Sequence, residues 1–91
     1  MIRQSIVVAN RLGLHARAAA KLVRLTSRFS SDIYVSREDL NQQIDSKSIL
    51  GILMLAASQG TRLIISINGS DEVEAGDAIR ELFEKKFGEE H

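Results

Sequence analysis

The alternation of apolar and polar positions divides the chain into predicted strands and helices. Residues 32–36 and 61–67 contain apolar side chains at every second position, and residues 2–9 are β-branched and partly alternating; both patterns are typical of strands. A short strand over 42–45 follows the polar turn at 37–41. The predicted inward positions are Ile6, Val8, Ile33, Val35, Leu63, Ile65 and Ile67. Each long strand therefore has one face for a core and one for solvent.

Three segments have helical spacing instead. They cover residues 16–28, a short stretch 48–55 whose pattern fades at 58–60, and residues 72–87, after which Gly88 ends the last helix. The predicted core positions of the two longer helices are Ala19, Leu22, Val23, Thr26, Ala75, Ala78, Ile79, Leu82 and Phe83.

The predicted order is strand, helix, strand, strand, helix, strand, helix. Alternating strands interspersed with helices indicate an α+β sandwich, with the helices on one face of the sheet and the other face open. With 91 residues, we expect a single domain, 1–91, with one thin core and no cleft between lobes.

Composition narrows the classes of function. The chain contains no cysteine, which excludes disulfide frameworks and thiolate metal sites. No apolar stretch has the length of a membrane span or a signal peptide, so we expect a cytoplasmic protein without membrane insertion. The chain has no Walker-type glycine loop and no EF-hand spacing, and His91, the last residue, is expected to fray. We therefore expect no cofactor and no metal.

The charges are sorted along the chain, although their sum is zero. Residues 1–31 carry six bases and no acid, whereas residues 71–91 carry eight acids and three bases. The bases on the outer side of the first helix form a basic stripe, which consists of Arg17, Lys21, Arg24 and Arg28. Such a stripe is either a solvated face or a docking surface for an acidic partner. Its unbroken sign favours docking.

The stretch "NRLGLHARAAAKLV", residues 10–23, places His15 after the turn at Gly13 and directly before the first predicted helix. At this N-cap position the first N–H groups lack partners and the helix dipole adds about half a positive charge. That potential favours the neutral, nucleophilic imidazole and attracts an anion. Arg17 adds a guanidinium that can hold phosphate oxygens. The residues therefore fit a phosphoryl acceptor, with a histidine that merely caps its helix as the alternative.

Two motifs, "LGLHARAAAKLV" (12–23) and "KSILGILML" (47–55), resemble the HPr family, the histidine-containing phosphocarriers of the bacterial phosphotransferase system. The resemblance spans essentially the whole chain. It implies an open-faced β-sandwich of four antiparallel strands under three helices. It also implies that His15 accepts a phosphoryl group through Nδ1 from Enzyme I, which is charged by phosphoenolpyruvate. The group would then pass to a histidine of an A-type permease or regulatory component, with Arg17 stabilising the phosphate.

One position departs from the family pattern, because Ala18 stands where the family usually has proline. Alanine keeps the helix and returns a backbone donor close to the phosphate site. We expect transfer to be retained.

Ser48 heads the short second helix, and we expect its side chain to cap that helix. The resemblance adds that this serine is a regulatory phosphorylation site of an ATP-dependent kinase in some members, whereas Ser46 fits the pattern less well. A phosphate would add roughly −1.5 to −2 charges beside a surface built for an acidic partner and weaken docking.

The second helix is also more apolar than a short helix with one buried side requires. We expect the excess to form an exposed apolar patch near His15, surrounded by the basic stripe. The predicted members of this patch are Leu14, Ile49, Leu50 and Leu53.

Three functions remain open. The first is a monomeric phosphocarrier, an intermediate in transfer rather than a turnover enzyme, serving sugar transport or a nitrogen-linked regulatory branch. The second is a regulatory protein-binding module controlled by a kinase and a phosphatase acting on Ser48. The third is an RNA-binding domain using the basic helix. The zero net charge and the absence of stacking aromatics count against the third, so we expect no nucleic-acid partner.

Overall fold

The structure, a computed structural model, describes residues 1–89, so the expectation for His91 lies outside the described residues. The elements are β1 (Ile2–Val7), α1 (Ala16–Thr26), β2 (Asp32–Arg37), β3 (Ile44–Asp45), α2 (Ile49–Met54), β4 (Arg62–Asn68), α3 (Glu72–Glu84) and the 3₁₀ helix η1 (Lys86–Gly88). Their order confirms the predicted one. Within the described part of the chain, none of the helices combines the length and apolar character needed to cross a bilayer.

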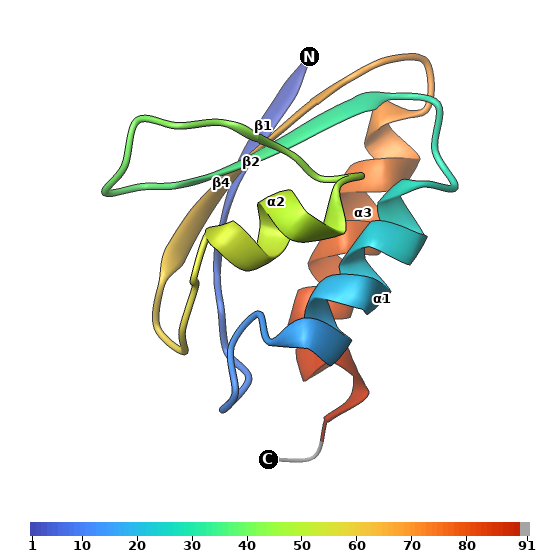
Figure 1. Cartoon of the computed structure of the whole chain (residues 1–91). Coiled ribbons are helices and arrows are strands. Elements are labelled where there is room, and N and C mark those ends of the chain that lie inside the picture. The colour runs from blue at the N-terminus through green and yellow to red at the C-terminus, as the bar shows by residue number, and fades with distance from the viewer. Residues whose placement is uncertain (90–91) are drawn as a thin grey trace.

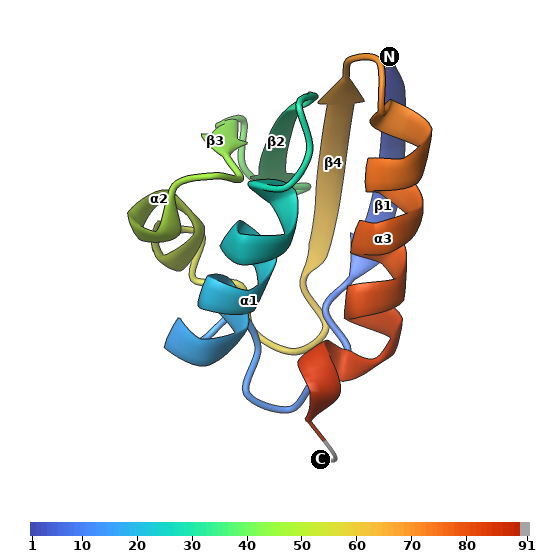
Figure 2. The same ribbon diagram turned by 90° about the vertical axis from the view of Figure 1, so that its right-hand side faces the viewer.

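The four strands form one antiparallel sheet in the order β1-β4-β2-β3. The central strand β4 pairs with β1 on one side, where Ile6 is opposite Leu63, and with β2 on the other, where Val35 is opposite Ile65. The helices cover one face of this sheet (Figure 1 and Figure 2). The predicted open-faced β-sandwich is therefore confirmed.

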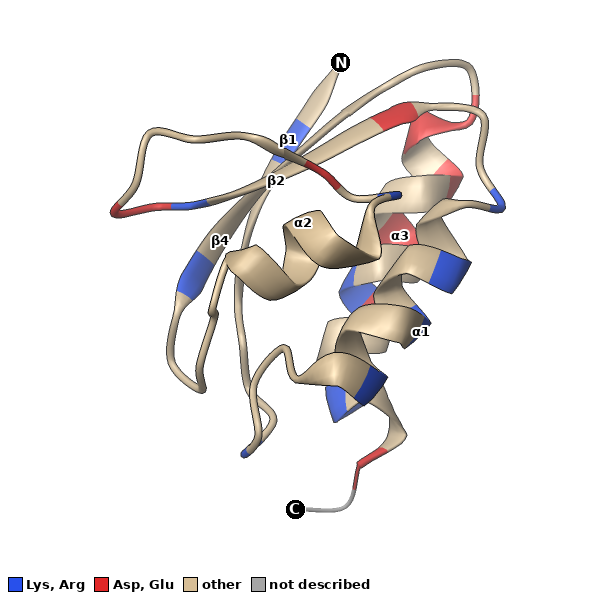
Figure 3. Cartoon of the chain, viewed as in Figure 1, with Lys and Arg blue, Asp and Glu red and all other residues tan. Residues whose placement is uncertain are grey.

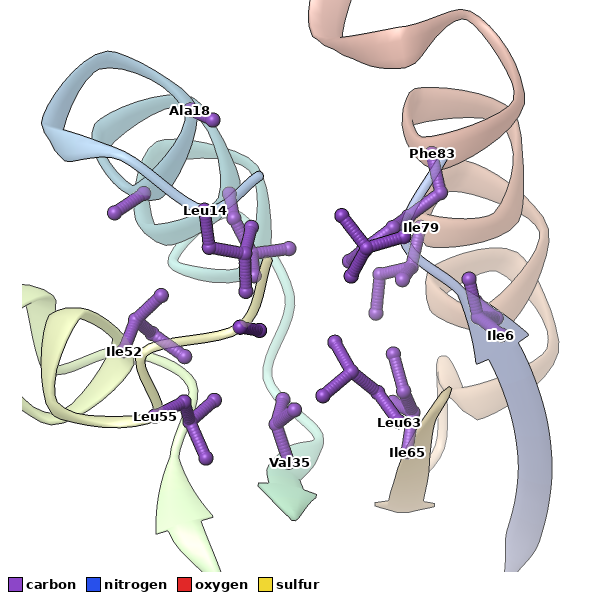
Figure 4. Close-up of a cluster of buried hydrophobic side chains, with 14 of the residues drawn as sticks. Ile6, Leu14, Ala18, Val35, Ile52, Leu55, Leu63, Ile65, Ile79 and Phe83 are labelled. Atoms are coloured by element: carbon purple, nitrogen blue, oxygen red, sulfur yellow. The ribbon is translucent and has the colours of Figure 1, made fainter. Parts of the chain in front are cut away.

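The core lies between the helices and the covered face of the sheet (Figure 4). Every predicted inward strand position is at most 7% exposed, because alternate side chains of a strand point to the same face. On the helices, Val23, Ala78 and Leu82 are only partly buried, while Gly76 faces the core. The predicted helical faces are thus slightly rotated from the observed ones.

The last helix ends earlier than predicted. It stops at Glu84 because Lys86 and Phe87 adopt left-handed backbone angles, with φ of 53° and 59°. The Phe87 ring is buried and packs edge to face against Phe83, with ring centroids 4.8 Å apart. The free energy gained by burying this ring offsets the cost of the left-handed backbone angles.

Candidate functional site

His15 is the N-cap residue of α1, as predicted. Its backbone is extended, with φ −70° and ψ 177°, and its carbonyl oxygen accepts the first helical hydrogen bond from Ala19 at 2.8 Å. The backbone N–H of Arg17 donates to His15 Nδ1 at 3.3 Å. An N–H group can only donate, so Nδ1 presents its lone pair to the electropositive end of the helix.

The other ring nitrogen, His15 Nε2, is hydrogen-bonded to the carboxylate of Glu89. The second oxygen of that carboxylate, Oε1, accepts a hydrogen bond from Asn10 Nδ2 at 2.8 Å. The hydrogen bond from Asn10 and the contact with His15 lower the pKa of Glu89 below its ordinary value. A charged carboxylate only accepts, so Nε2 carries the ring proton.

Glu89 reaches the histidine because the C-terminal arm, residues 85–89, runs on from the end of α3 and passes below the start of α1 (Figure 1). The buried ring of Phe87 anchors this arm, and Lys21 Nζ donates to the Phe87 carbonyl oxygen at 2.6 Å. Sequence reasoning missed Glu89. The only local signal is an acid directly after the glycine that was expected to end the last helix.

Asn10 joins the arm to the loop that precedes α1. Its side chain is fully buried, and Nδ2 donates to the Gly13 carbonyl oxygen at 2.7 Å as well as to Glu89. Within residues 1–89, Asn10 Oδ1 has no hydrogen-bond partner. A single amide group thus connects the turn before His15 with the carboxylate that contacts its ring.

The basic stripe lies on α1 as predicted, but its four residues differ in exposure and in their contacts. Arg17, Arg24 and Arg28 are exposed, whereas Lys21 is half-buried and uses its ammonium group to hold the arm. Lys21 is therefore already engaged by a contact within the chain, and its role in docking stays a prediction. Figure 3 shows basic positions along α1 beside α2, which carries no charge.

The predicted apolar patch is correct only in part. Leu14 is 5% exposed and points into the core together with Ile52 (Figure 4), so its expected exposure is wrong. The cause is its backbone N–H, which donates to the Ala57 carbonyl oxygen at 2.8 Å and fixes Leu14 on the inner side of the loop. Leu53 packs partly against the core.

The exposed apolar side chains on α2 include two that the sequence predicted and one that it missed. Ile49 is 44% and Leu50 68% exposed, and Met54, which was not predicted, is 71% exposed. Leu12, also missed, is exposed in the loop before His15. We use the name apolar patch for these four exposed side chains, Leu12, Ile49, Leu50 and Met54.

Ser48 is the N-cap of α2, as predicted, and its Oγ accepts a hydrogen bond from the Gly51 N–H at 3.1 Å. It is exposed, whereas Ser46 is fully buried and its carbonyl oxygen accepts a hydrogen bond from the Thr26 hydroxyl at 3.0 Å. Of the two serines, only Ser48 is accessible in the folded chain.

The arrangement at His15 can bind and covalently hold a small anion. Nδ1 presents a lone pair, a backbone N–H lies beside it, and the ring is only 26% exposed. Among residues 1–89, no three His, Asp or Glu side chains come together to hold a metal ion. The chemistry that this geometry offers is nucleophilic attack by imidazole on an electrophilic, anionic centre.

The chain resembles known proteins over its full length. A family model described as the PTS HPr component phosphorylation site matches residues 2–85. Phosphocarrier protein HPr of Xylella fastidiosa (strain 9a5c) is 46% identical over 90 residues, which covers 99% of each chain. The crystal structure of HPr-C-His from Thermoanaerobacter tengcongensis is 45% identical, with a TM-score of 0.94 and 100% of each chain covered. The crystal structure of an HPr dimer from the same organism is 45% identical, with a TM-score of 0.76. The match covers 98% of this chain and 100% of the dimer's chain.

Proposed function

The chain belongs to the HPr family, the phosphocarriers of the phosphotransferase system, and from this premise we propose that His15 Nδ1 is the atom that carries the phosphoryl group. The observation that supports this most directly is that each of the two ring nitrogens has its own hydrogen-bond partner. Nδ1 accepts from the Arg17 N–H while Nε2 contacts Glu89. The nitrogen at the electropositive end of α1 is therefore the unprotonated, nucleophilic one.

In the proposed step, the Nδ1 lone pair attacks the phosphorus atom presented by Enzyme I. The Nδ1–P bond forms as the bond from phosphorus to its donor group breaks, and that electron pair remains with the donor. The ring proton stays on Nε2. The Arg17 N–H, released from Nδ1 when the bond forms, becomes available to a phosphoryl oxygen, and the Arg17 guanidinium supplies positive charge alongside.

Incubation with a purified bacterial Enzyme I and radiolabelled phosphoenolpyruvate tests the assignment. We expect one acid-labile label, located on His15 by tandem mass spectrometry and absent from His15→Ala. Arg17→Ala should take up the label more slowly, because the phosphoryl oxygens lose a cation. Ser48→Ala is the matched control and should be labelled normally. Label on another residue, or label retained by His15→Ala, would reject the proposal.

Membership in the HPr family supports the choice of partners, and the exposed side chains on α1 and α2 offer them a surface. We propose that Enzyme I and A-type components dock on the apolar patch and on the exposed cations Arg17, Arg24 and Arg28. An apolar centre with a charged rim is typical of transient protein interfaces. In this proposal the chain acts as a monomer in the cytoplasm, in sugar uptake or in a nitrogen-linked regulatory branch.

A second proposed function is regulation through Ser48. The exposure of its hydroxyl at the start of α2, next to Ile49 and Leu50 of the apolar patch, favours this reading. A serine kinase would add a dianion there, and a phosphatase would remove it. The added charge would repel an acidic docking partner without disturbing the core.

A further inference from the structure

We propose that Glu89 is a positioning residue, which holds His15 in the Nε2–H tautomer and so keeps the lone pair on Nδ1. This inference rests on the proposed role of His15 as the phosphoryl acceptor. It adds a function for the C-terminal arm, whose last described residue lies 74 positions from the histidine in sequence.

The two polar contacts of the imidazole agree on a single tautomer. A neutral imidazole has one donor and one acceptor nitrogen. The Arg17 N–H can pair only with an acceptor, which makes Nδ1 unprotonated, and the Glu89 carboxylate can pair only with a donor, which makes Nε2 protonated. The Arg17 contact is long, at 3.3 Å, so the carboxylate provides the stronger preference.

The carboxylate is itself held in place from several sides. The Asn10 amide donates to Oε1 at 2.8 Å, and the Glu89 side chain is only 14% exposed. Behind it, the Phe87 ring is buried and the Phe87 carbonyl oxygen accepts from Lys21 Nζ at 2.6 Å. A carboxylate held this firmly can orient the ring, because little entropy is lost when the pair forms.

The same contact serves both the charged and the neutral forms of the ring. When Nδ1 forms a bond to phosphorus while Nε2 keeps its proton, the ring gains a positive charge, which the adjacent carboxylate offsets. When the Nδ1–P bond breaks again, its electron pair returns to Nδ1 as the group leaves for the next acceptor. The proton remains on Nε2 throughout, so no proton transfer accompanies either step.

The tautomer can be measured directly on the unphosphorylated protein. The ring nitrogens of ¹⁵N-histidine-labelled protein distinguish the two tautomers by NMR at neutral pH, with His91→Gln identifying the His15 resonances. We expect the Nε2–H form to dominate in the wild type and a mixture of both forms in Glu89→Ala. Glu84→Ala, which removes an exposed acid from α3, is the matched control and should resemble the wild type. An unchanged tautomer pattern in Glu89→Ala would overturn the proposal.

Transfer kinetics provide the second readout. In Glu89→Ala, we expect the maximal rate of phosphorylation by Enzyme I to fall about tenfold with an unchanged KM for Enzyme I, because the ring is less often in the reactive form. Glu89→Gln should also be slower, because one amide oxygen must serve both Asn10 and His15. A rise in KM alone would instead make Glu89 a docking residue and reject the positioning role.

The two proposals fail separately. If the label from phosphoenolpyruvate is found away from His15, the acceptor assignment fails whatever the tautomer is. If His15 is labelled at the normal rate in Glu89→Ala, only the positioning role fails. Amide NMR spectra of each variant, compared with the wild type, establish that the loss is not one of folding.

Discussion

The backbone N–H of Leu14 donates to the carbonyl oxygen of Ala57 at 2.8 Å, and this bond brings two loops into direct contact beneath His15. The contact requires Gly13. Its φ is +66°, and a Cβ there would lie 2.8 Å from Ser58 Cα and closer still to the Ala57 oxygen. The position of the histidine therefore depends on a backbone approach that only glycine allows.

Gly13→Ala should destabilise the fold by about 2–4 kcal/mol, because steric overlap with backbone adds to the strain of positive φ. Gly60→Ala is the matched control. Its φ is +92°, but nothing lies within 4 Å of an added Cβ, so about 1 kcal/mol of strain alone is expected. Urea unfolding of both variants checks this prediction. Equal losses in the two variants would contradict the role given to the close approach.

Asp71 should make stability depend on pH at the acid end. Its carboxylate accepts hydrogen bonds from the hydroxyl and N–H groups of both Ser30 and Ser31. These bonds, the one from the Ser31 hydroxyl foremost, lower the pKa of Asp71 from 3.8 to about 2. The lowered pKa means that the charged form is favoured in the folded chain. This stabilisation is present above the unfolded-state pKa and disappears as pH falls toward 2.

Asp71→Asn should accordingly be less stable than the wild type at pH 7, and the difference should shrink as pH falls from 3.8 toward 2. The free energy of unfolding in urea, measured across this range, checks the sign. Asp77→Asn replaces an exposed acid of α3, the helix that begins directly after Asp71, and serves as the control. A difference that grows on acidification would show that Asp71 is not the group responsible.

Ala18→Pro should leave phosphoryl transfer intact. Ala18 is the third residue of α1, where the N–H has no acceptor within the helix, and proline is compatible with the first turn. The lifetime of phosphohistidine is expected to change, because the substitution removes an N–H near Nδ1. Transfer assays and the decay of label, compared with wild type, measure the two quantities. If the wild type transfers no phosphoryl group and Ala18→Pro does, the prediction is refuted.

Leu50→Ser and Arg24→Glu should each raise the KM for Enzyme I by about fivefold with little change in unfolding free energy. Leu50 is 68% exposed, so its loss removes contact area from a partner and not from the core. Val73→Ser, which replaces an exposed apolar residue on α3, is the control for Leu50. High salt should weaken docking in the wild type more than in Arg24→Glu. Unchanged KM in both variants would place docking elsewhere.

Ser48→Asp should slow phosphorylation by Enzyme I while preserving the fold, because aspartate caps a helix as well as serine does. Ser48→Ala should behave in the opposite way. Its rate of phosphorylation by Enzyme I should be normal, and its free energy of unfolding should fall by about 1 kcal/mol because the helix cap is missing. Rates of label uptake and urea unfolding separate the two effects. A normal rate in Ser48→Asp would argue against regulation through this position.

The sequence by itself determined which elements form, their order and the buried faces of the strands. Periodicity is a local property. The alternate positions Leu63, Ile65 and Ile67 can be recognised in the sequence without knowing which strands pair with this one, and all three are buried. The same holds for His15 at the start of α1 and for Ser48 at the start of α2. A capping residue acts on N–H groups two or three positions away, so its place can be predicted from the residues beside it.

Only the tertiary structure decided which distant groups meet at the histidine. Burial of Phe87 anchors the arm that brings Glu89 to Nε2, and the Phe87 carbonyl oxygen accepts a hydrogen bond from Lys21 of the basic stripe. Leu14 is drawn inward by a bond to a loop 43 residues away. Each of these outcomes is a contact between residues far apart in sequence, which forms only when the elements pack together. Packing between elements decides such contacts, and the hydrophobic periodicity of a single helix or strand does not reveal them.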